Sequence, residues 1–308
     1  MPPSGGWRAA LDAVPAAAVA AVLEARVTVV IGASDAGKTT LVAALASELA
    51  SRGERVGVVD SDVGQSEIGP PTTVGLGRIA ARVTRLSDAE PIAFQFVGVS
   101  SPVRDIRGVV EAARRMIDRA RAERFERVLV DTSGLVLGWP GHRLKQEKIE
   151  ALDSDLLLFL EREDECAPIA ERYAGASRPR VLRLRAQGRP GSRSQIARRR
   201  HRMETIDAYL RNARSVNVAR SAADLPRGLQ WADVVGGLCG LDDADGNTIA
   251  LGVVEEIAHD VVGVLVPLPQ SPRVARVRVG RERPDGTLLA PAPARRASTP
   301  DGDGRDGA

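Results

Sequence analysis

The stretch VVIGASDAGKTTLV, residues 29–42, limits the possible folds of this chain more than any other. An apolar run predicts a buried strand over 27–31, and the Ala- and Leu-rich residues 41–50 predict a helix after it. Between strand and helix, GASDAGKT matches the pattern G-x-x-x-x-G-K-[ST], which binds phosphate in that structural context. The alternative is a chance glycine turn, which would not require all three parts in register. The stretch therefore predicts a nucleotide-binding P-loop.

The predicted loop offers a nucleotide two kinds of contact. Its backbone N–H groups and the helix N-terminus both favour an anion. Lys38 is expected to reach the β- and γ-phosphates, and the Thr39 hydroxyl to hold Mg²⁺. Of the 43 basic residues only Lys38, Lys145 and Lys148 are lysines, so a lysine in this loop stands out. The predicted nucleotide-binding residues are Gly32, Ala33, Ser34, Asp35, Ala36, Gly37, Lys38, Thr39 and Thr40.

Predicted strands and helices alternate through the first two thirds of the chain. Further strands are expected at 55–60, 79–86, 91–97, 127–131, 156–160 and 180–184. Helices are expected at 103–122 and 162–173. Such alternation predicts an α/β fold, here a P-loop NTPase domain over 27–218 with a parallel sheet and helices on both faces. A helix within residues 1–26 is expected to precede it.

The pattern changes near residue 225. Short apolar runs separated by turns, including the hairpin signal Asp245–Gly246, predict a small C-terminal β-domain over 225–286. Residues 287–308 are rich in Pro, Gly, Asp and Arg with few apolar residues, which predicts a disordered tail. The 308 residues, 44% of them hydrophobic, are enough for one sizeable core and a smaller unit.

Composition narrows the setting and the partners. The net charge of +3 creates no global attraction for nucleic acid, so a nucleic-acid site must be local. Cys166 and Cys239 lack C-x-x-C spacing and, with three histidines, form no zinc set, which favours a reduced, cytoplasmic setting. The apolar residues 14–25 are short and run directly into the first strand, which favours a leading helix over a signal peptide. No membrane partner is expected, and the oligomeric state is left open.

Acidic residues end two of the predicted strands. VVDSD places Asp60 and Asp62 at the end of the second strand, and VLVD places Asp131 at the end of a later one. Ligands of such sheets bind at the carboxyl ends of strands, where P-loop proteins hold their metal. Acids that merely terminate strands are the alternative. We expect Thr39 and acids of this set, Asp60, Asp62 and Asp131, to bind Mg²⁺, with one acid serving as a general base. The absence of an [NT]-K-x-D element argues against a switch-type GTPase but does not separate ATP from GTP.

A basic helix is predicted near the end of the P-loop domain. Residues 178–214 contain twelve arginines against only two acidic residues. The apolar stripe of the predicted helix consists of Ile196, Met203, Ile206 and Leu210. Arg198 and Arg202 lie on a neighbouring face, where like charges destabilise a helix unless an acidic partner such as phosphate is present. A solvated basic face is the alternative. Because the arginine fork binds phosphate bidentately, we predict an arginine-rich lid at about 190–212 over the nucleotide.

Five motifs in order resemble those of the P-loop polynucleotide 5′-hydroxyl kinases. This family includes the kinase subunit of mRNA cleavage and polyadenylation factor and the pre-ribosomal-RNA processing kinases. The similar segments are GASDAGKTT, DSDVGQ, FVGVSSP, DTSGLVLG and the R-x-x-x-R pair of the lid, within residues 27–210. The resemblance implies transfer of the γ-phosphate of ATP, or alternatively of GTP, to the 5′-hydroxyl end of RNA or DNA, with Mg²⁺ as cofactor.

The resemblance also implies roles for individual residues. The catalytic residues would be Lys38, Asp62, Arg198 and Arg202, and the acceptor would be bound by Gln65, Gly98, Ser100 and Ser101. Asp35 occupies the loop-aspartate position of the family. The family commonly has a base-stacking aromatic residue after T-x-G, where this chain has Leu135, and Trp139 lies nearby but out of register. The grip on the acceptor is therefore expected to be weaker or rearranged.

Two other functions share these features. A non-catalytic assembly factor would use the β-domain as an interface, and it would bind nucleotide without transferring phosphate. A small-molecule kinase would hold a metabolite with its serine segment, and small alcohols would then compete with oligonucleotides. The sequence leaves both alternatives open.

Overall fold

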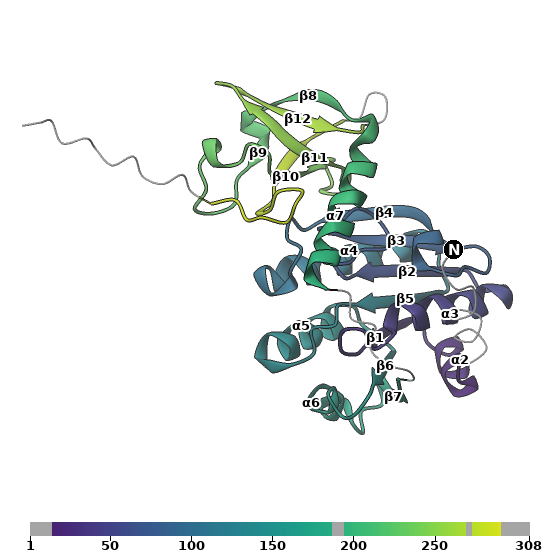
Figure 1. Cartoon of the computed structure of the whole chain (residues 1–308). Helices are drawn as coiled ribbons and strands as arrows, with labels where there is room; N and C mark the ends of the chain where they lie inside the picture. The colour runs from purple at the N-terminus through teal and green to yellow at the C-terminus, as the bar shows by residue number, and fades with distance from the viewer. Residues whose placement is uncertain (1–13, 187–193, 269–272, 291–308) are drawn as a thin grey trace, which may run out of the picture.

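The structure, a computed structural model, describes residues 14–186, 194–268 and 273–290. They form two lobes, each built on its own β-sheet, and one helix lies along both lobes (Figure 1). Within these residues no helix is long and apolar enough to cross a bilayer.

The larger lobe contains a seven-stranded sheet. Its strands are β1 (Val27–Ile31), β2 (Val56–Ser61), β3 (Thr73–Ile79), β4 (Glu90–Phe96), β5 (Arg127–Thr132), β6 (Leu156–Glu161) and β7 (Arg180–Arg185). In space they follow the order β4–β3–β2–β5–β1–β6–β7, and the strands from β2 to β7 in that order are parallel. The adjacent strands β2, β5 and β1 are almost wholly buried. They bring the P-loop and the strand-end acids to one edge of the sheet.

The sheet is parallel from β2 to β7, as predicted, but at the other side β3 runs antiparallel to β2, and β4 pairs antiparallel with β3. The connection between these two strands, residues 80–89, is too short for the crossover that parallel strands require. The strand predicted at 79–86 lies earlier, because glycines interrupt the apolar pattern of β3. A Cβ on Gly75 would lie 1.9 Å from the carbonyl oxygen of Ile68, so only glycine lets the preceding loop pack on this strand.

Helices cover both faces of this sheet, as predicted. Helices α2 (Ala16–Leu23) and α3 (Lys38–Ser51) pack on one face, and α4 (Ile106–Ala122), α5 (Gly138–Ala151) and the short α6 (Ala167–Ala170) pack on the other. Helix α2 falls within the helix predicted inside 1–26, and residues 1–13 lie outside the described ranges. Helix α5 has no predicted counterpart, because its buried face includes Lys145 and Lys148 in place of a continuous apolar stripe.

The smaller lobe is a six-stranded, mainly antiparallel sheet with an apolar core of its own. Its strands are β8 (Arg214–Ala219), β9 (Ala223–Asp224), β10 (Leu238–Asp242), β11 (Thr248–Ile257), β12 (Val261–Val266) and β13 (Arg276–Val279). They follow the order β8–β12–β11–β10–β13–β9. The lobe accounts for the small β-domain expected at the C-terminal end.

Both predicted limits of the β-domain move outward. Since β8 pairs with β12, the domain begins at about residue 214 and not at 225, and the P-loop domain ends before 218. At the other end Leu289 is buried in the core of the smaller lobe, so the predicted disorder is wrong for residues 287–290. Residues 291–308 of that tail lie outside the described ranges.

Helix α7 (Gln195–Tyr209) runs from the smaller lobe to the P-loop and falls within the range predicted for the lid (Figure 1). Its C-terminal half is anchored between the lobes, where Ile206 is buried with Phe96, Leu238 and Leu251. The Tyr209 hydroxyl accepts the N–H of Leu251 at 3.1 Å. The smaller lobe therefore holds the C-terminal end of α7. Arg198 and Arg202 lie nearer the other end of the same helix. Lid residues 190–193 lie outside the described ranges.

The predicted apolar stripe of this helix is buried only in part. Ile196 and Met203 are 81% and 39% exposed, whereas Ile206 is 1% exposed. Polar contacts, and not an apolar interface, hold the N-terminal half of α7, which leaves Ile196 and Met203 accessible to solvent.

Replacing Ile206 with alanine should lower the free energy of unfolding by about 2–5 kcal/mol, the range for truncating a buried isoleucine. The same substitution at Ile196 is the matched control, and it should leave the unfolding free energy almost unchanged because that side chain is exposed. Denaturant unfolding of both variants measures the difference. Equal losses at the two positions would show that Ile206 does not anchor the helix.

Candidate active site

The P-loop lies at the carboxyl end of β1 and leads into α3. Asp35 and Gly37 have left-handed backbone conformations, with φ of +59° and +98°. Gly32 packs so closely on β6 that a Cβ there would lie 2.2 Å from the carbonyl oxygen of Leu160. The shape of the loop thus depends on both glycines of the motif.

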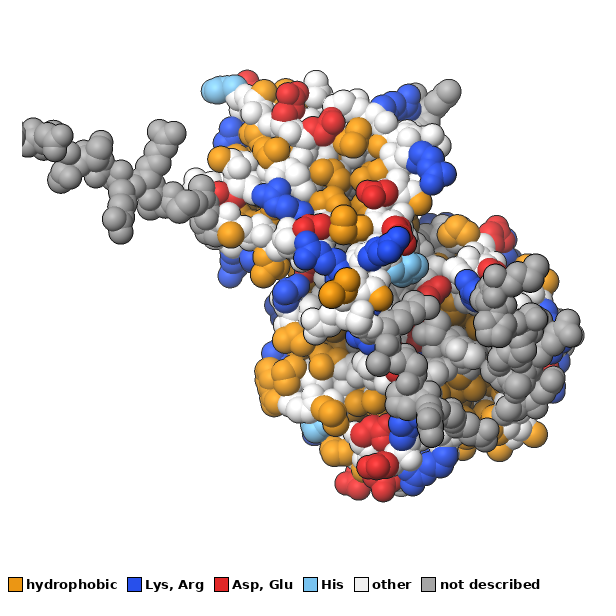
Figure 2. Space-filling view, in the orientation of Figure 1, with side chains coloured by type: hydrophobic (Ala, Val, Ile, Leu, Met, Phe, Trp, Pro, Cys, Tyr) orange, Lys and Arg blue, Asp and Glu red, His pale blue; other side chains and the backbone are white. Residues whose placement is uncertain are grey.

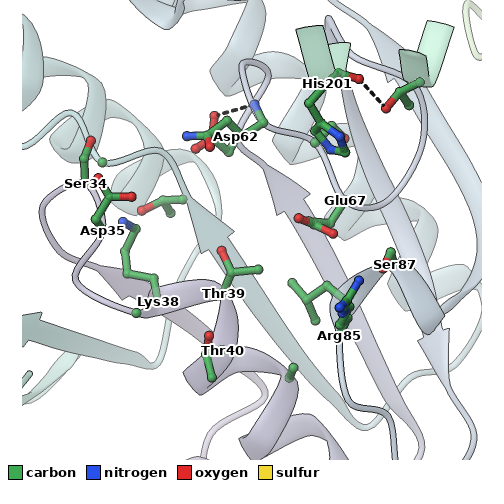
Figure 3. A pocket seen from close by; sticks show the side chains of 18 of the residues that line it. Ser34, Asp35, Lys38, Thr39, Thr40, Asp62, Glu67, Arg85, Ser87 and His201 are labelled. Atoms are coloured by element: carbon green, nitrogen blue, oxygen red, sulfur yellow. Dashed lines mark hydrogen bonds between the residues drawn. The ribbon is translucent and has the colours of Figure 1, made fainter. Parts of the chain in front are cut away.

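Lys38 and Thr39 begin α3 and face a cavity of about 720 Å³ (Figure 3). Lys38 is 7% exposed, and its Nζ donates to the carbonyl of Ala33 in the same loop at 2.9 Å. The Thr39 hydroxyl donates to Asp131 Oδ2 at 2.6 Å. A P-loop threonine next to a strand-end aspartate is the pair that holds Mg²⁺ in P-loop enzymes.

The donors around Thr39 fit a magnesium ion. Asp131 is 2% exposed, and its Oδ1 has no hydrogen-bond partner among the described residues. Burial raises the pKa of Asp131 to about 6, against the opposing charge of Lys38, and a bound cation would favour the ionised form. Protein sites hold Mg²⁺ with only one or two carboxylates plus phosphate oxygens and water. Consistently, the described ranges contain no group of three or more His, Cys, Asp or Glu side chains arranged around a metal.

The two acids near the end of β2 have different surroundings. Asp60 is buried, and its Oδ2 accepts the N–H of Glu67 at 2.6 Å. Burial and the neighbouring Asp131 raise the pKa of Asp60 to about 8. Asp62 lines the cavity (Figure 3). Asp60 therefore supports the loop that follows the strand, and Asp62 is the acid that can meet a substrate.

Gly64 is the point where three predicted elements meet. Its N–H donates to Asp62 Oδ1 at 3.0 Å, and its carbonyl accepts from Arg202 Nη1 at 3.4 Å. A Cβ on Gly64 would lie 2.7 Å from the carbonyl oxygen of Ser100. The acid loop, the lid helix and the serine segment are thus in contact at a residue without a side chain.

Arg198 and Arg202 approach the site from α7. Arg198 forms an ion pair with Asp35 of the P-loop at 3.3 Å, and these side chains are 26% and 24% exposed. In the described part of the chain, the Nε atoms of both arginines are buried without a hydrogen-bond partner. Phosphate oxygens would satisfy such donors. The aspartate in this anion-binding loop thus holds a lid arginine over the P-loop.

A sequence model described as the mRNA cleavage and polyadenylation factor CLP1 P-loop matches residues 32–212. The match covers more than half of the 308 residues. The chain belongs to this family. The matched segment includes the P-loop, the strand-end acids, the serine segment and α7, and it confirms the resemblance inferred from the five motifs.

Several members of the CLP1 family named polyribonucleotide 5′-hydroxyl-kinase are similar in sequence. The relative from Pyrococcus horikoshii is 39% identical over 61% of this chain and 50% of its own length. The relative from Methanocaldococcus jannaschii is 32% identical over 62% and 52%. A Clp1 from Xenopus tropicalis is 29% identical over 58% and 43%. The chain therefore spans about half the length of the relatives it matches.

The likeness in fold to a solved structure extends beyond the P-loop domain. The structure of a Clp1p–Pcf11p complex matches this one with a TM-score of 0.65 at 14% identity, over 83% of this chain and 74% of that one. This coverage exceeds the segment 32–212, so the likeness includes part of the smaller lobe. At this identity the likeness concerns the fold.

The cavity brings the P-loop together with Asp62 and Gln65, whereas the other expected acceptor residues do not line it. Gly98 lies at the contact between the lobes, where a Cβ would come within 2.7 Å of the Cα of Gly280. Ser100 lies beside Gly64, and neither Ser100 nor Ser101 lines the cavity. The motif FVGVSSP alone could not show that Gly98 lies at the contact between the lobes while Ser100 lies beside the acid loop.

Several residues that line the cavity were not expected from the sequence. His201 and Thr205 project from α7, and Thr84, Arg85 and Ser87 come from the connection between β3 and β4 (Figure 3). The helical spacing from Arg198 could have indicated the first two, since positions three and seven residues later share its face. The 84–87 segment carries no local signal, because it reaches the cavity only through the antiparallel turn.

Proposed function

We propose that this chain is a polynucleotide 5′-hydroxyl kinase that transfers the γ-phosphate of ATP to the 5′-hydroxyl end of RNA. The observation that carries the proposal is the hydrogen bond between Thr39 and Asp131 at the P-loop. Arg198 of the lid helix reaches the same loop. The names of the relatives from Pyrococcus and Methanocaldococcus support the reaction and the RNA acceptor. GTP as donor and DNA as acceptor are the alternatives that an assay must separate.

Nucleotide binding rests on the P-loop. Its backbone N–H groups surround the phosphates, and Lys38 turns from the Ala33 carbonyl to the β- and γ-phosphate oxygens. Thr39, Asp131 and Asp62 are the residues that would hold Mg²⁺, which neutralises charge on those oxygens when it is bound. This binding aligns the γ-phosphorus with the acceptor, and alignment is the main requirement of phosphoryl transfer.

In the transfer step, the 5′-oxygen of the acceptor attacks the γ-phosphorus while the bond to the β-phosphate oxygen breaks. ADP leaves, and the proton of the 5′-hydroxyl passes to the Asp62 carboxylate. Arg198 and Arg202 stabilise the negative charge on the transferring group. Gln65, Ser100 and Ser101 hold the acceptor end next to Asp62.

The acceptor is bound by its end and not along its length. Basic side chains gather around α7 where the two lobes meet, while the net charge of the chain is only +3 (Figure 2). Leu135 is partly buried against the core, so no aromatic side chain stands at the family position. Trp139 is 68% exposed at the start of α5, with the Arg143 guanidinium 5.2 Å from its ring centroid. Recognition of the acceptor therefore depends on a short contact with its 5′ end.

Incubation with γ-labelled ATP, Mg²⁺ and a short 5′-hydroxyl RNA should yield RNA labelled at its 5′ end. The same RNA with a 5′-phosphate is the matched control and should take up no label, because it lacks the attacking hydroxyl. Parallel reactions with GTP and with DNA identify the donor and the acceptor. Nucleotide binding without transfer would support an assembly factor, and transfer to small alcohols but not to RNA would support a small-molecule kinase.

We also propose a cytoplasmic setting for the chain. Both cysteines, Cys166 and Cys239, are buried and free, which suits a reducing compartment.

A further inference from the structure

All three lysines of the chain meet near the carboxyl edge of the larger sheet. Lys38 belongs to the P-loop, and Lys145 and Lys148 extend from α5 with 0% exposure. A fully buried ammonium group is unfavourable unless nearby groups compensate for the lost hydration. Every other basic residue in this chain is an arginine or a histidine. Two buried lysines three residues apart on one helix therefore call for a specific role.

Lys148 contacts the strand-end acids through a serine. Its Nζ donates to Ser61 Oγ at 2.7 Å, and this hydroxyl donates to the backbone carbonyl of Asp131 at 2.7 Å. Ser61 ends β2 immediately before Asp62, and Asp131 lies on the neighbouring strand β5. We name the chain of contacts Lys148–Ser61–Asp131 the β2 relay. It joins the two strand ends that carry the acids of the site.

Lys145 is connected to the P-loop strand through a threonine. Its Nζ donates to Thr132 Oγ1 at 2.9 Å and to the Ser133 carbonyl at 2.5 Å. The Thr132 hydroxyl donates in turn to the backbone carbonyl of Val30 at 2.8 Å. Val30 lies on β1, two residues before the first glycine of the P-loop. The contacts Lys145–Thr132–Val30, which we name the β1 relay, join the end of β5 to the strand that carries the P-loop.

From these contacts we infer that Lys145 and Lys148 are positioning residues that hold the magnesium-binding and nucleotide-binding parts of the site in register. Neither ammonium group makes an ion pair with a carboxylate within the described residues. Lys148 acts through the Ser61 hydroxyl, and Lys145 acts through the Thr132 hydroxyl and a direct bond to the Ser133 carbonyl. The two relays cross the adjacent strands β2, β5 and β1 in turn. They therefore set the separations between Asp62, Asp131 and the P-loop, as partners beyond the direct ligands do in metal sites.

The inference rests on the proposed function for the reaction, but its test uses binding. A fluorescent ATP analogue is titrated with and without Mg²⁺ against the whole chain. In Lys148→Met the affinity for the ATP analogue without metal should stay within about twofold of that of the unaltered chain. Effects of independent sites add to within about this factor. The Mg²⁺ concentration for half-maximal tightening should rise about 10–100-fold, the range for losing such an outer partner. If the unaltered chain shows this response but transfers no phosphate, the proposed function fails and the inference is still tested.

Ser61→Ala removes only the central hydroxyl of the β2 relay and keeps the buried charge. It should reproduce the loss of Mg²⁺ response seen in Lys148→Met, and it provides the test if the lysine variant does not fold. The double variant should be within about twofold of either single variant, because residues of one relay act as a unit. Combining Ser61→Ala with Lys145→Met should instead multiply the two losses, since these residues belong to different relays.

Gln146→Met is the matched control, because Gln146 lies on the same helix and its side chain, within the described part of the chain, donates to Glu150 at 3.1 Å and contacts neither relay. It should leave nucleotide affinity and Mg²⁺ response unchanged, and thermal unfolding of all variants reports their stability. An unchanged Mg²⁺ response in folded Lys148→Met or Ser61→Ala would overturn the inference. Losses that multiply within the β2 relay would overturn it as well, because they would show two independent contributions to stability or packing.

Discussion

Alanine at both Arg198 and Arg202 should lower kcat by about 10³–10⁵-fold, the range for arginines that contact a transferring phosphoryl group. Both side chains reach the P-loop region from α7 and have buried Nε donors that lack partners in the described part of the chain. We therefore expect their charge to act on the γ-phosphate and not on the body of the acceptor. The Kd for a 5′-hydroxyl oligonucleotide should consequently change little.

Steady-state kinetics and oligonucleotide binding at several salt concentrations test this expectation. Arg200→Ala is the matched control, because Arg200 is on the same helix, is 80% exposed and pairs with Glu204. That variant should keep the kcat of the unaltered chain. If the double variant binds the acceptor much more weakly, depends less on salt and turns over normally at saturation, α7 is a nucleic-acid clamp and the lid assignment is wrong.

Asp62→Asn should lower kcat by about 10²–10⁴-fold, the usual contribution of a general base. Asparagine keeps an oxygen that can accept the N–H of Gly64, the contact that Asp62 makes at 3.0 Å, so the loop should retain its shape. The amide cannot take the proton of the 5′-hydroxyl. Nucleotide affinity measured without Mg²⁺ should stay close to that of the unaltered chain, and rapid-quench measurement of the transfer step at saturating Mg²⁺ should show the loss.

Glu67→Gln provides the comparison for Asp62→Asn. Glu67 also lines the cavity, so its substitution tests whether any nearby carboxylate can serve as the base. Its effect should be much smaller than that of Asp62→Asn. A larger loss of kcat in Glu67→Gln than in Asp62→Asn would show that Glu67 is the general base. A loss of kcat smaller than about 10²-fold in Asp62→Asn would indicate that Asp131 or Asp35 is the base instead.

The P-loop could be predicted because its strand, loop and helix occupy one continuous stretch, residues 27–50. Backbone conformation there follows from local pattern, glycine positions and helix periodicity. The family could be inferred for a related reason, since each of the five motifs is short and their order along the chain is visible. The acids could be placed at strand ends, and the resemblance of DSDVGQ selected Asp62. That Asp60 is buried beside Asp131 while Asp62 lines the cavity could be seen only in the structure.

The antiparallel strands, the start of the smaller lobe at β8 and the anchor of α7 all required the three-dimensional structure. Each depends on pairing or packing between distant segments, such as β8 with β12 and Ile206 with Phe96. The local pattern contains no information about these partners, so it could not show which residues of the apolar stripe on α7 are buried.

The buried lysines show the same limit most clearly. A lysine on a helix is normally expected to face solvent, because burial of its charge is unfavourable. Lys148 is buried because Ser61, 87 residues earlier in the chain, meets it at the end of β2. That meeting depends on the sheet order β2–β5–β1, which does not follow the order of the chain. The sequence could specify which residues are rare and which strands end in acids, but only the packed sheet brings a hydroxyl and a carbonyl within reach of each ammonium group.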